Sequence, residues 1–235
     1  MRNTTPLIGG IDGERYWMNF DKKFDRYEEN AHIQKVVAKE LIKLVPEKKY
    51  NTIFEIGAGT GVLTKNIVKN IEYKNLIVND KYLESEKYLK DLPSIEFVGG
   101  DIEKLDIRKA DLIISSSVFQ WIEDKDKLFE KIMRATDILV FSIYIKGNLM
   151  EVSDHFGISL EYLDMCELKA LLTHYFKNVS EYEEEFKISF DTPIEGLKHL
   201  KNTGVTGIGH TNTQMIRSYS SKELTYKVGY FVCKK

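Results

Sequence analysis

The stretch Phe54-Glu55-Ile56-Gly57-Ala58-Gly59-Thr60-Gly61 decides the fold of this 235-residue chain. It continues an apolar run that begins at Tyr50, and a helical spacing of apolar residues follows it over 62–71. Glycine accepts the backbone dihedrals of a sharp turn, and its missing side chain lets a ligand lie directly on the backbone. The stretch therefore predicts a ligand-binding turn between a strand and a helix.

The spacing of the glycines narrows the choice of ligand. A dinucleotide fingerprint places its third small residue at the position that Val62 occupies in this chain. The order Gly-x-Gly-x-Gly after the acidic Glu55 instead resembles the first motif of class I S-adenosylmethionine (SAM) methyltransferases. A merely structural loop is also compatible with the turn taken alone. Other residues therefore have to decide between the two interpretations.

Composition indicates an ordinary globular protein with one large core. Hydrophobic residues make up 43% of the chain, charged residues 30%, and the net charge is −2. The mixed charges offer no basic stripe, which disfavours a nucleic-acid partner. Cys166 and Cys233 lack metal-ligand spacing, so we expect no metal site and a reducing cytoplasm. The longest apolar stretch, 138–145, is far shorter than a membrane span, so we expect no membrane partner.

Strand and helix patterns alternate through the first half of the chain. Continuous apolar strands separated by helices predict a parallel sheet that is covered on both faces. The resemblance implies the Rossmann-like α/β fold of class I methyltransferases, with seven mostly parallel strands, an antiparallel last strand and a small lid. The predicted strands are 50–56, 75–78, 95–98, 112–115, 138–144, 179–190 and 224–232. The predicted helices are 29–45, 62–71, 82–89, 125–134 and 165–175.

The domain organisation follows from the segments without a clear pattern. Residues 1–19 lack periodicity and are expected to form a flexible lead-in, whereas 20–235 form a single domain. The segment 193–214 separates the last two predicted strands and is rich in glycine and threonine. It is therefore predicted to be an insertion that forms part of a lid.

Acidic residues stand at the carboxyl ends of the first three predicted strands, namely Glu55, Asp80 and Asp101. Ligands of open α/β sheets bind at this edge, where the strand order reverses. A helix cap or a turn explains any one of these acids, but all three beside the glycine turn favour SAM. We expect Asp80 to accept the ribose hydroxyls and Asp101 the adenine amino group, with Glu55 facing the amino-acid end. The predicted cofactor contacts are Glu55, Gly57, Ala58, Gly59, Gly61, Asp80, Lys81, Asp101, Ile102 and Ser116.

The end of the fourth strand carries Ser115-Ser116-Ser117-Val118-Phe119-Gln120-Trp121. Methyltransferases that act on the amino groups of bases usually have an Asn/Asp-Pro-Pro-aromatic motif at this point. The prolines of this chain stand at 6, 46, 93 and 193, so that motif is absent. Phe119 and Trp121 are either core aromatics or walls of a methyl-transfer pocket, and the sequence leaves both interpretations open.

From about residue 20 onward the chain resembles the malonyl-[acyl-carrier protein] O-methyltransferases of biotin synthesis. The glycine turn and the acids are shared by many methyltransferases, whereas the insertion and the closing strand discriminate this family. Lys22 and Lys198 depart from the family, which often has arginine there, so a bidentate contact is lost. The segments that carry the resemblance are Phe20 with Tyr27, Ala31 and Gln34; Ser115 to Trp121; Leu197 to Thr206; and Leu224-Thr225-Tyr226.

The resemblance implies methyl transfer from SAM to the free carboxylate of a malonyl thioester, which leaves S-adenosyl-L-homocysteine. The thioester is carried by the acyl-carrier protein or by coenzyme A. Catalytic residues are then expected at Tyr27, Gln120, Trp121 and Tyr226. Lys198 and Lys201, together with His199, are expected to form a basic patch for the acidic carrier.

Two other functions stay open at this point. One is a SAM-dependent O-methyltransferase of another small carboxylate, such as an aconitate, which has no need of a basic patch for a carrier. The other is a protein that binds SAM without turning it over. Both share the features between Gly57 and Asp101 with the malonyl enzyme.

Overall fold

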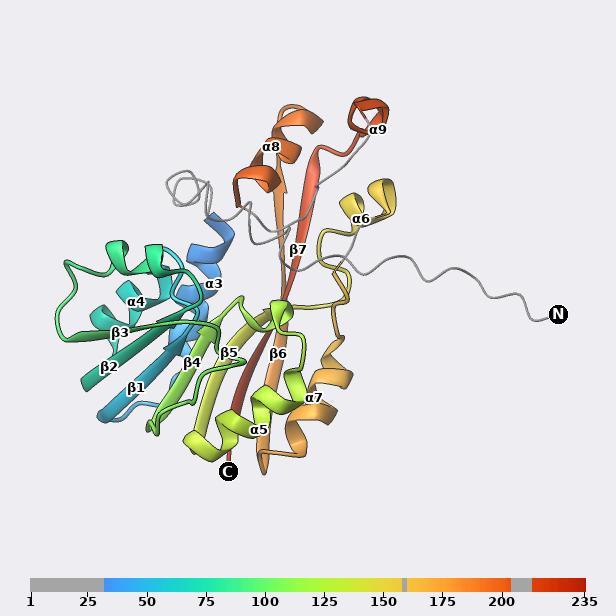
Figure 1. Ribbon diagram of the computed structural model, residues 1–235. Coiled ribbons are helices and arrows are strands. Elements are labelled where there is room, and N and C mark those ends of the chain that lie inside the picture. The colour runs from blue at the N-terminus through green and yellow to red at the C-terminus, as the bar shows by residue number, and fades with distance from the viewer. Residues whose placement is uncertain (1–31, 158–159, 204–212) are drawn as a thin grey trace.

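The computed structural model describes residues 32–157, 160–203 and 213–235. A seven-stranded sheet of order β3-β2-β1-β4-β5-β7-β6 forms its centre (Figure 1). Neighbouring strands from β3 to β5 are parallel, and β7 runs antiparallel to both β5 and β6. This confirms the predicted α/β sheet with its antiparallel last strand. The strands are β1 Tyr50–Ile56, β2 Tyr73–Asp80, β3 Ile95–Gly99, β4 Leu112–Ser116, β5 Ile138–Tyr144, β6 Asn178–Ser189 and β7 Glu223–Lys234.

Helices cover both faces of the sheet (Figure 1). Apolar residues of α3 and α4 belong to one core cluster, and those of α5 and α7 belong to the other. The two clusters meet the sheet from opposite sides, because successive residues of a strand point to opposite faces. The helices are α3 His32–Lys43, α4 Val62–Asn70, α5 Lys125–Ala135, α6 Met150–Phe156, α7 Met165–Thr173, α8 Pro193–Thr203 and α9 Thr213–Ser218. Two short 3₁₀ helices, η1 Leu83–Tyr88 and η2 Phe119–Trp121, complete the elements.

Local sequence explains where the helices on the second face begin. At the start of α5, the Asp124 side chain accepts a hydrogen bond of 3.0 Å from the backbone N–H of Lys127. At the start of α7, Asp164 and Glu167 form a capping box. Each cap satisfies backbone donors that have no partner within the helix.

The segment 82–89, predicted as a helix, is a 3₁₀ helix over Leu83–Tyr88 instead. Within this segment only Ser85 and Leu89 are buried. A stripe of apolar residues on one face is what normally holds a surface helix to the core. With that stripe missing, a tighter and shorter turn forms. Helix α6 is an element that the sequence analysis did not predict.

The predicted insertion 193–214 begins as a regular helix, α8, which buries Leu197 and Leu200. Residues 204–212 lie outside the described residues, and α9 begins at Thr213. Both helices lie beyond the sheet, at the end where β6 and β7 extend past β5 (Figure 1). The predicted lead-in 1–19 also lies outside the described residues, as does Tyr27.

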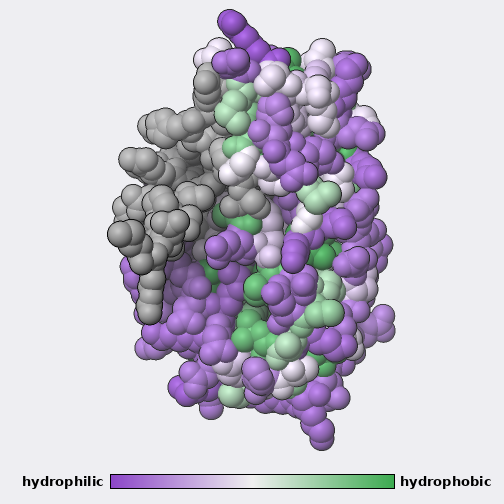
Figure 2. Space-filling view, turned by 90° about the vertical axis from the view of Figure 1, so that its right-hand side faces the viewer, coloured by the Kyte–Doolittle hydropathy of each residue, from purple (hydrophilic) through white to green (hydrophobic). Residues whose placement is uncertain are grey.

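Figure 2 shows the face at the right-hand side of Figure 1, on which polar areas surround smaller apolar ones. Large hydrophobic side chains that are exposed include Leu83, Met150, Tyr182 and Ile194. Within the described ranges, no helix is both long and apolar enough to cross a membrane.

Candidate functional site

The glycine turn joins β1 to α4, and its glycines have different structural roles. Gly57, Gly59 and Gly61 have φ angles of +79°, +54° and +76°, in the left-handed region that favours glycine. A Cβ atom at Gly57 would lie 2.2 Å from Cγ2 of Val118, so this glycine permits close packing. At Gly59 no described atom lies within 4 Å of such a Cβ. The turn therefore presents bare backbone to open space at Gly59, where a ligand can lie.

The end of β2 holds this turn in place. The Asp80 carboxylate accepts hydrogen bonds from the backbone N–H of Gly59 at 2.7 Å and of Tyr82 at 2.8 Å. The carbonyl oxygen of Asn79 accepts from the backbone N–H of Gly57 at 2.8 Å and of Ala58 at 3.0 Å. Asp80 thus lies at the site where the sequence analysis expected it, and it also fixes the shape of the turn.

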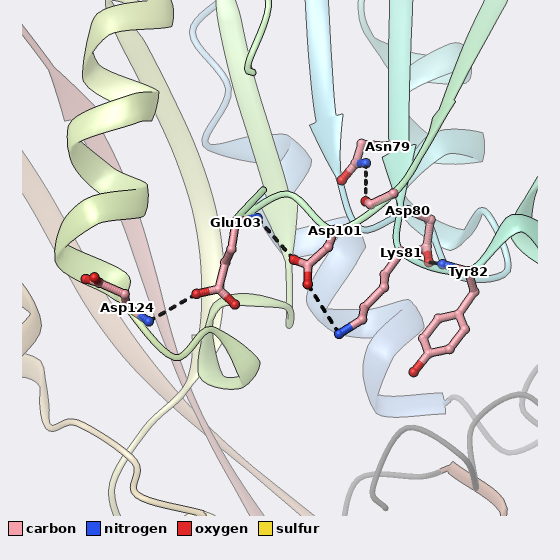
Figure 3. Close-up of polar contacts among 8 residues, drawn as sticks. Asn79, Asp80, Lys81, Tyr82, Asp101, Glu103 and Asp124 are labelled. Atoms are coloured by element: carbon pink, nitrogen blue, oxygen red, sulfur yellow. Dashed lines mark hydrogen bonds and ion pairs between the residues drawn. The ribbon is translucent and has the colours of Figure 1, made fainter. Parts of the chain in front are cut away.

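Asn79 is a residue of the site that the sequence analysis missed. Its side-chain amide is buried and donates to the carbonyl oxygens of Val98 and Gly100, each at 2.9 Å. Figure 3 shows one of these two bonds. These bonds tie the end of β3 to the end of β2. An amide side chain is unusual in a buried strand. This feature of the sequence could have indicated that Asn79 belongs to the site.

The loop that follows β3 carries Asp101 (Figure 3). One oxygen of its carboxylate accepts from the backbone N–H of Glu103 at 3.1 Å, and the other lies 3.4 Å from the Lys81 ammonium. The Glu103 carboxylate in turn accepts from the backbone N–H of Asp124 at 3.1 Å. Polar contacts from β2 and from the start of α5 therefore determine where the Asp101 carboxylate lies.

Lys131 of α5 fixes the same loop from the other side. Its ammonium donates to the carbonyl oxygens of Ile102 at 3.1 Å and of Glu103 at 3.3 Å, and also to that of Leu105. Ile102 is buried in the cluster that contains Phe119. The position of Ile102 is therefore fixed by the core, and its packing against the adenine ring stays a prediction.

Glu55 is fully buried at the end of β1. Burial raises the pKa of its carboxyl group to about 8, nearby Thr64 opposes this rise, and the Asp80 charge adds to it. Among the described residues, neither Glu55 oxygen has a partner of normal hydrogen-bond geometry, and the Thr60 and Thr64 hydroxyls have none either. Buried polar groups normally have partners. This group of unsatisfied atoms beside the glycine turn therefore suits the polar end of a ligand.

The end of β4 forms the third side of the site. The Ser115 hydroxyl donates to the carbonyl oxygen of Ile56 at 2.9 Å, and the Ser116 hydroxyl lies 3.1 Å from that of Ser142. The Gln120 amide donates to the carbonyl oxygen of Ser117 at 2.6 Å, while its own oxygen is buried with no partner in the described part of the chain. In this orientation the Gln120 oxygen is an acceptor that a ligand could use.

The two aromatic residues of this segment differ in environment. Phe119 has no exposed area and packs edge-on against Phe129, with ring centroids 5.4 Å apart. Phe119 is therefore a core aromatic residue and not a wall of the methyl-transfer pocket, two possibilities that the sequence left open. Trp121 is only partly buried, and its place in the wall of a pocket stays a prediction.

Tyr226 of β7 lies fully buried beneath α8. Its hydroxyl is 3.1 Å from Nε2 of His199, whose ring lies 5.4 Å from that of Phe190. Burial lowers the pKa of His199, and the nearby His32 at the start of α3 lowers it further. The imidazole is therefore neutral at pH 7.

The basic patch on α8 is smaller than expected. Lys198 and Lys201 are both exposed, as their helical spacing predicts. His199 instead turns inward to Tyr226, so its inclusion in the patch was wrong. The physical reason is the helix period, which places residue 199 on the face that contacts β7.

The fold and the site together define a methyltransferase. Residues 54–137 match the family model described as "Methyltransferase domain". YcgJ from Bacillus subtilis has a similar structure, with a TM-score of 0.63 at 12% identity over 85% of this chain and 98% of that one. Phosphoethanolamine N-methyltransferase 2 from Haemonchus contortus, solved with S-adenosylhomocysteine, gives a TM-score of 0.62 at 15% identity, over 97% of this chain and 60% of that one.

Sequence similarity narrows the class to one family. The malonyl-[acyl-carrier protein] O-methyltransferase of Calditerrivibrio nitroreducens is 33% identical over 236 aligned residues, which cover 92% of this chain and 95% of that protein. The chain therefore belongs to the malonyl-[acyl-carrier protein] O-methyltransferase family.

Proposed function

We propose that this protein transfers a methyl group from SAM to the free carboxylate of a malonyl thioester carried by the acyl-carrier protein. The observation that carries the proposal is the 33% identity over nearly the full length of a relative with that name. The product is a methyl ester, which hides the charge of the malonyl group, and S-adenosylhomocysteine is released.

The described site fits the cofactor in three ways. Gly59 leaves open space over the turn, where the cofactor would lie on the backbone. Glu55 is a buried carboxyl group whose oxygens have no partner of normal hydrogen-bond geometry among the described residues, and it suits the cationic amino-acid end. Asp80 and Asp101 stand at the next two strand ends, for the ribose and the adenine. When bound, SAM supplies a methyl group on a positively charged sulfur.

The reaction makes few chemical demands on the protein. A carboxylate is already ionised at neutral pH, so no general base has to remove a proton. The contribution of the protein is to align the carboxylate oxygen with the methyl group and to keep water out. Alignment of this kind contributes up to about 7–11 kcal/mol in well-oriented intramolecular reactions.

Tyr226 is our candidate for holding the malonyl carboxylate. With neutral His199 in the tautomer that carries hydrogen on Nε2, the imidazole donates to the Tyr226 oxygen and so fixes the position of the hydroxyl group that would contact the substrate. Trp121 and Gln120 would form the neighbouring wall of the pocket. We keep Tyr27 as a second donor, although it lies outside the described residues.

Lys198 and Lys201 are our candidates for the contact with the carrier. They are exposed on the same face of α8, next to the segment that holds Tyr226. Their charges complement an acidic carrier protein, whereas an enzyme for a free acid such as an aconitate does not need a basic patch for a carrier. We place the reaction in the cytoplasm, which agrees with the two free cysteines, Cys166 and Cys233.

The test is a methyl-transfer assay with SAM labelled in its methyl group. Malonyl-carrier protein should be labelled and acetyl-carrier protein should not, because only the malonyl group has a free carboxylate. Malonyl-coenzyme A and a panel of free dicarboxylic and tricarboxylic acids complete the comparison. Labelling of acetyl-carrier protein, or faster labelling of a free acid than of malonyl-carrier protein, would contradict the proposal.

A further inference from the structure

Lys81 follows Asp80 directly, at the point where β2 ends. Its side chain extends across the site toward the loop after β3, and the ammonium lies 3.4 Å from an oxygen of Asp101 (Figure 3). The Asp101 side chain is 21% exposed and that of Lys81 is 45% exposed. An ion pair at this level of exposure contributes little to stability. Stability alone therefore gives no reason for a lysine at this position.

The position of the Asp101 carboxylate is tightly determined. Its other oxygen accepts from the backbone N–H of Glu103, and Lys131 holds the following loop through three carbonyl oxygens. Asn79 ties the start of this loop to β2. The oxygen beside Lys81 is thus presented by a rigid loop, and the pair offers a hydrogen-bond acceptor next to a charged donor.

This pattern complements one edge of adenine. The 6-amino group of adenine is a donor, and the two ring nitrogens that flank it, N1 and N7, are acceptors. A carboxylate beside an ammonium matches a donor beside an acceptor. A carboxylate alone recognises only the amino group.

We propose that Lys81 determines specificity for the purine of the cofactor, by donating a hydrogen bond to a ring nitrogen next to the amino group that Asp101 accepts. This inference rests on the proposed function, since it takes the ligand to be SAM or its product. It assigns Lys81 to the ring nitrogen and Asp101 to the exocyclic group. The two residues should therefore respond to different changes in the ligand.

The experiment measures dissociation constants by calorimetry for S-adenosylhomocysteine, its 1-deaza and 7-deaza analogues, and the analogue with a 6-oxo group. The proteins are the wild type, Lys81→Met, Asp101→Asn and the control Lys104→Met. Lys104 is exposed on the same loop, so its variant has the same change of charge close to the site. Thermal unfolding checks that each variant is folded.

We expect the wild type to bind S-adenosylhomocysteine about 5- to 30-fold more tightly than one of the two deaza analogues, the range for one partly exposed hydrogen bond to a charged donor. Lys81→Met should remove that preference, and Lys104→Met should keep it. Asp101→Asn should instead reduce the preference for the 6-amino group over the 6-oxo group.

Two results would overturn the inference while leaving the proposed function intact. One is that Lys81→Met weakens all four ligands by the same factor, which is the result expected of a structural or general electrostatic role. The other is that it changes none of them. Failure of the wild type to bind S-adenosylhomocysteine at all would overturn the proposed function, and the inference with it.

Discussion

The Asp80 carboxylate and the backbone N–H of Gly59 are joined by a hydrogen bond of 2.7 Å. Through this bond the end of β2 determines the shape of the turn between β1 and α4. The other Asp80 oxygen accepts from the backbone N–H of Tyr82. Both oxygens therefore already accept hydrogen bonds within the protein, and we expect ribose hydroxyls to donate to the same carboxylate.

Asp80→Asn should weaken both the fold and the site. The amide retains one acceptor oxygen and places a donor where the second acceptor stood. Loss of a buried hydrogen bond to a charged group costs about 1.5–3 kcal/mol of stability. Urea unfolding measures this loss, and calorimetry should show weaker binding of S-adenosylhomocysteine. Asp106→Asn, at an exposed position, is the control, and equal stabilities of the two variants would contradict the assigned role.

Alanine substitutions at two glycines of the turn, Gly57 and Gly59, should have different effects on stability and on cofactor affinity. Gly57→Ala brings a Cβ to 2.2 Å from Val118, so it should destabilise the fold by several kcal/mol, as overpacking in a left-handed position does. Gly59→Ala meets no described atom within 4 Å and should cost only about 1–2 kcal/mol for its backbone conformation.

Its methyl group nevertheless occupies the open space over the turn, so Gly59→Ala should lose binding of S-adenosylhomocysteine while it stays folded. Thermal unfolding and calorimetry on both variants make the comparison. Normal cofactor affinity of a folded Gly59→Ala protein would show that the ligand does not lie on this turn.

Glu55 should make the stability of the cofactor-free protein depend on pH. Its pKa is about 8 in the fold against a model value of 4.5, so the folded state retains the proton at a pH where the unfolded state has lost it. Stability should therefore fall as the pH rises from about 5 to 8, by at most about 1.4 kcal/mol per pH unit. Glu55→Gln should remove this dependence, because glutamine cannot ionise.

Thermal unfolding at pH 6 and pH 8 measures the effect. The variant should be the more stable protein at both pH values, and its advantage over the wild type should be larger at pH 8 than at pH 6. A wild-type protein whose stability does not fall over this interval would mean that Glu55 is ionised in the fold.

Reversing the charges of Lys198 and Lys201 to glutamate should affect mainly the carrier-bound substrate. We expect KM for malonyl-carrier protein to rise about 3- to 30-fold, because charges at the rim of an interface act mainly on association. KM for malonyl-coenzyme A should change much less. Lys109→Glu combined with Lys177→Glu changes two other exposed lysines by the same charge, and it should leave both values near those of the wild type.

Tyr226→Phe should raise KM for the malonyl substrate several-fold, because the variant loses the hydroxyl that we propose contacts the carboxylate. Affinity for S-adenosylhomocysteine should stay unchanged, since the hydroxyl lies beside His199 rather than at the glycine turn. Steady-state kinetics and calorimetry separate the two quantities. A selective loss of cofactor affinity would assign Tyr226 a different role.

Much of the fold was predictable because its signals are local. Apolar runs and helical spacing predicted the order of strands and helices, and the glycine turn marked the edge of the sheet that carries the site. The contacts that shape the site were not predictable in this way. Lys131 reaches carbonyl oxygens that are 26 or more positions away in the sequence, and no spacing rule connects such residues.

The inward orientation of His199 has a similar explanation. The helical period indicated that Lys198 and Lys201 share a face, but it did not show which face of α8 meets β7. That depends on Tyr226, which lies 27 positions further along the chain. The sequence predicted a helix over 82–89 but not its 3₁₀ form at Leu83–Tyr88. Its pattern does not show whether the core has a surface against which an α-helix could pack.

The position of β7 between β5 and β6 has a consequence for how the protein is made. Strand β6 is synthesised first, but its neighbour in the sheet is β7, which begins more than thirty residues later. Until then β6 emerges from the ribosome with its backbone groups unpaired, a state that invites pairing with other chains. We expect its glutamates at 181, 183, 184 and 185 to repel a second copy of the same strand and so to disfavour such pairing before β7 is made.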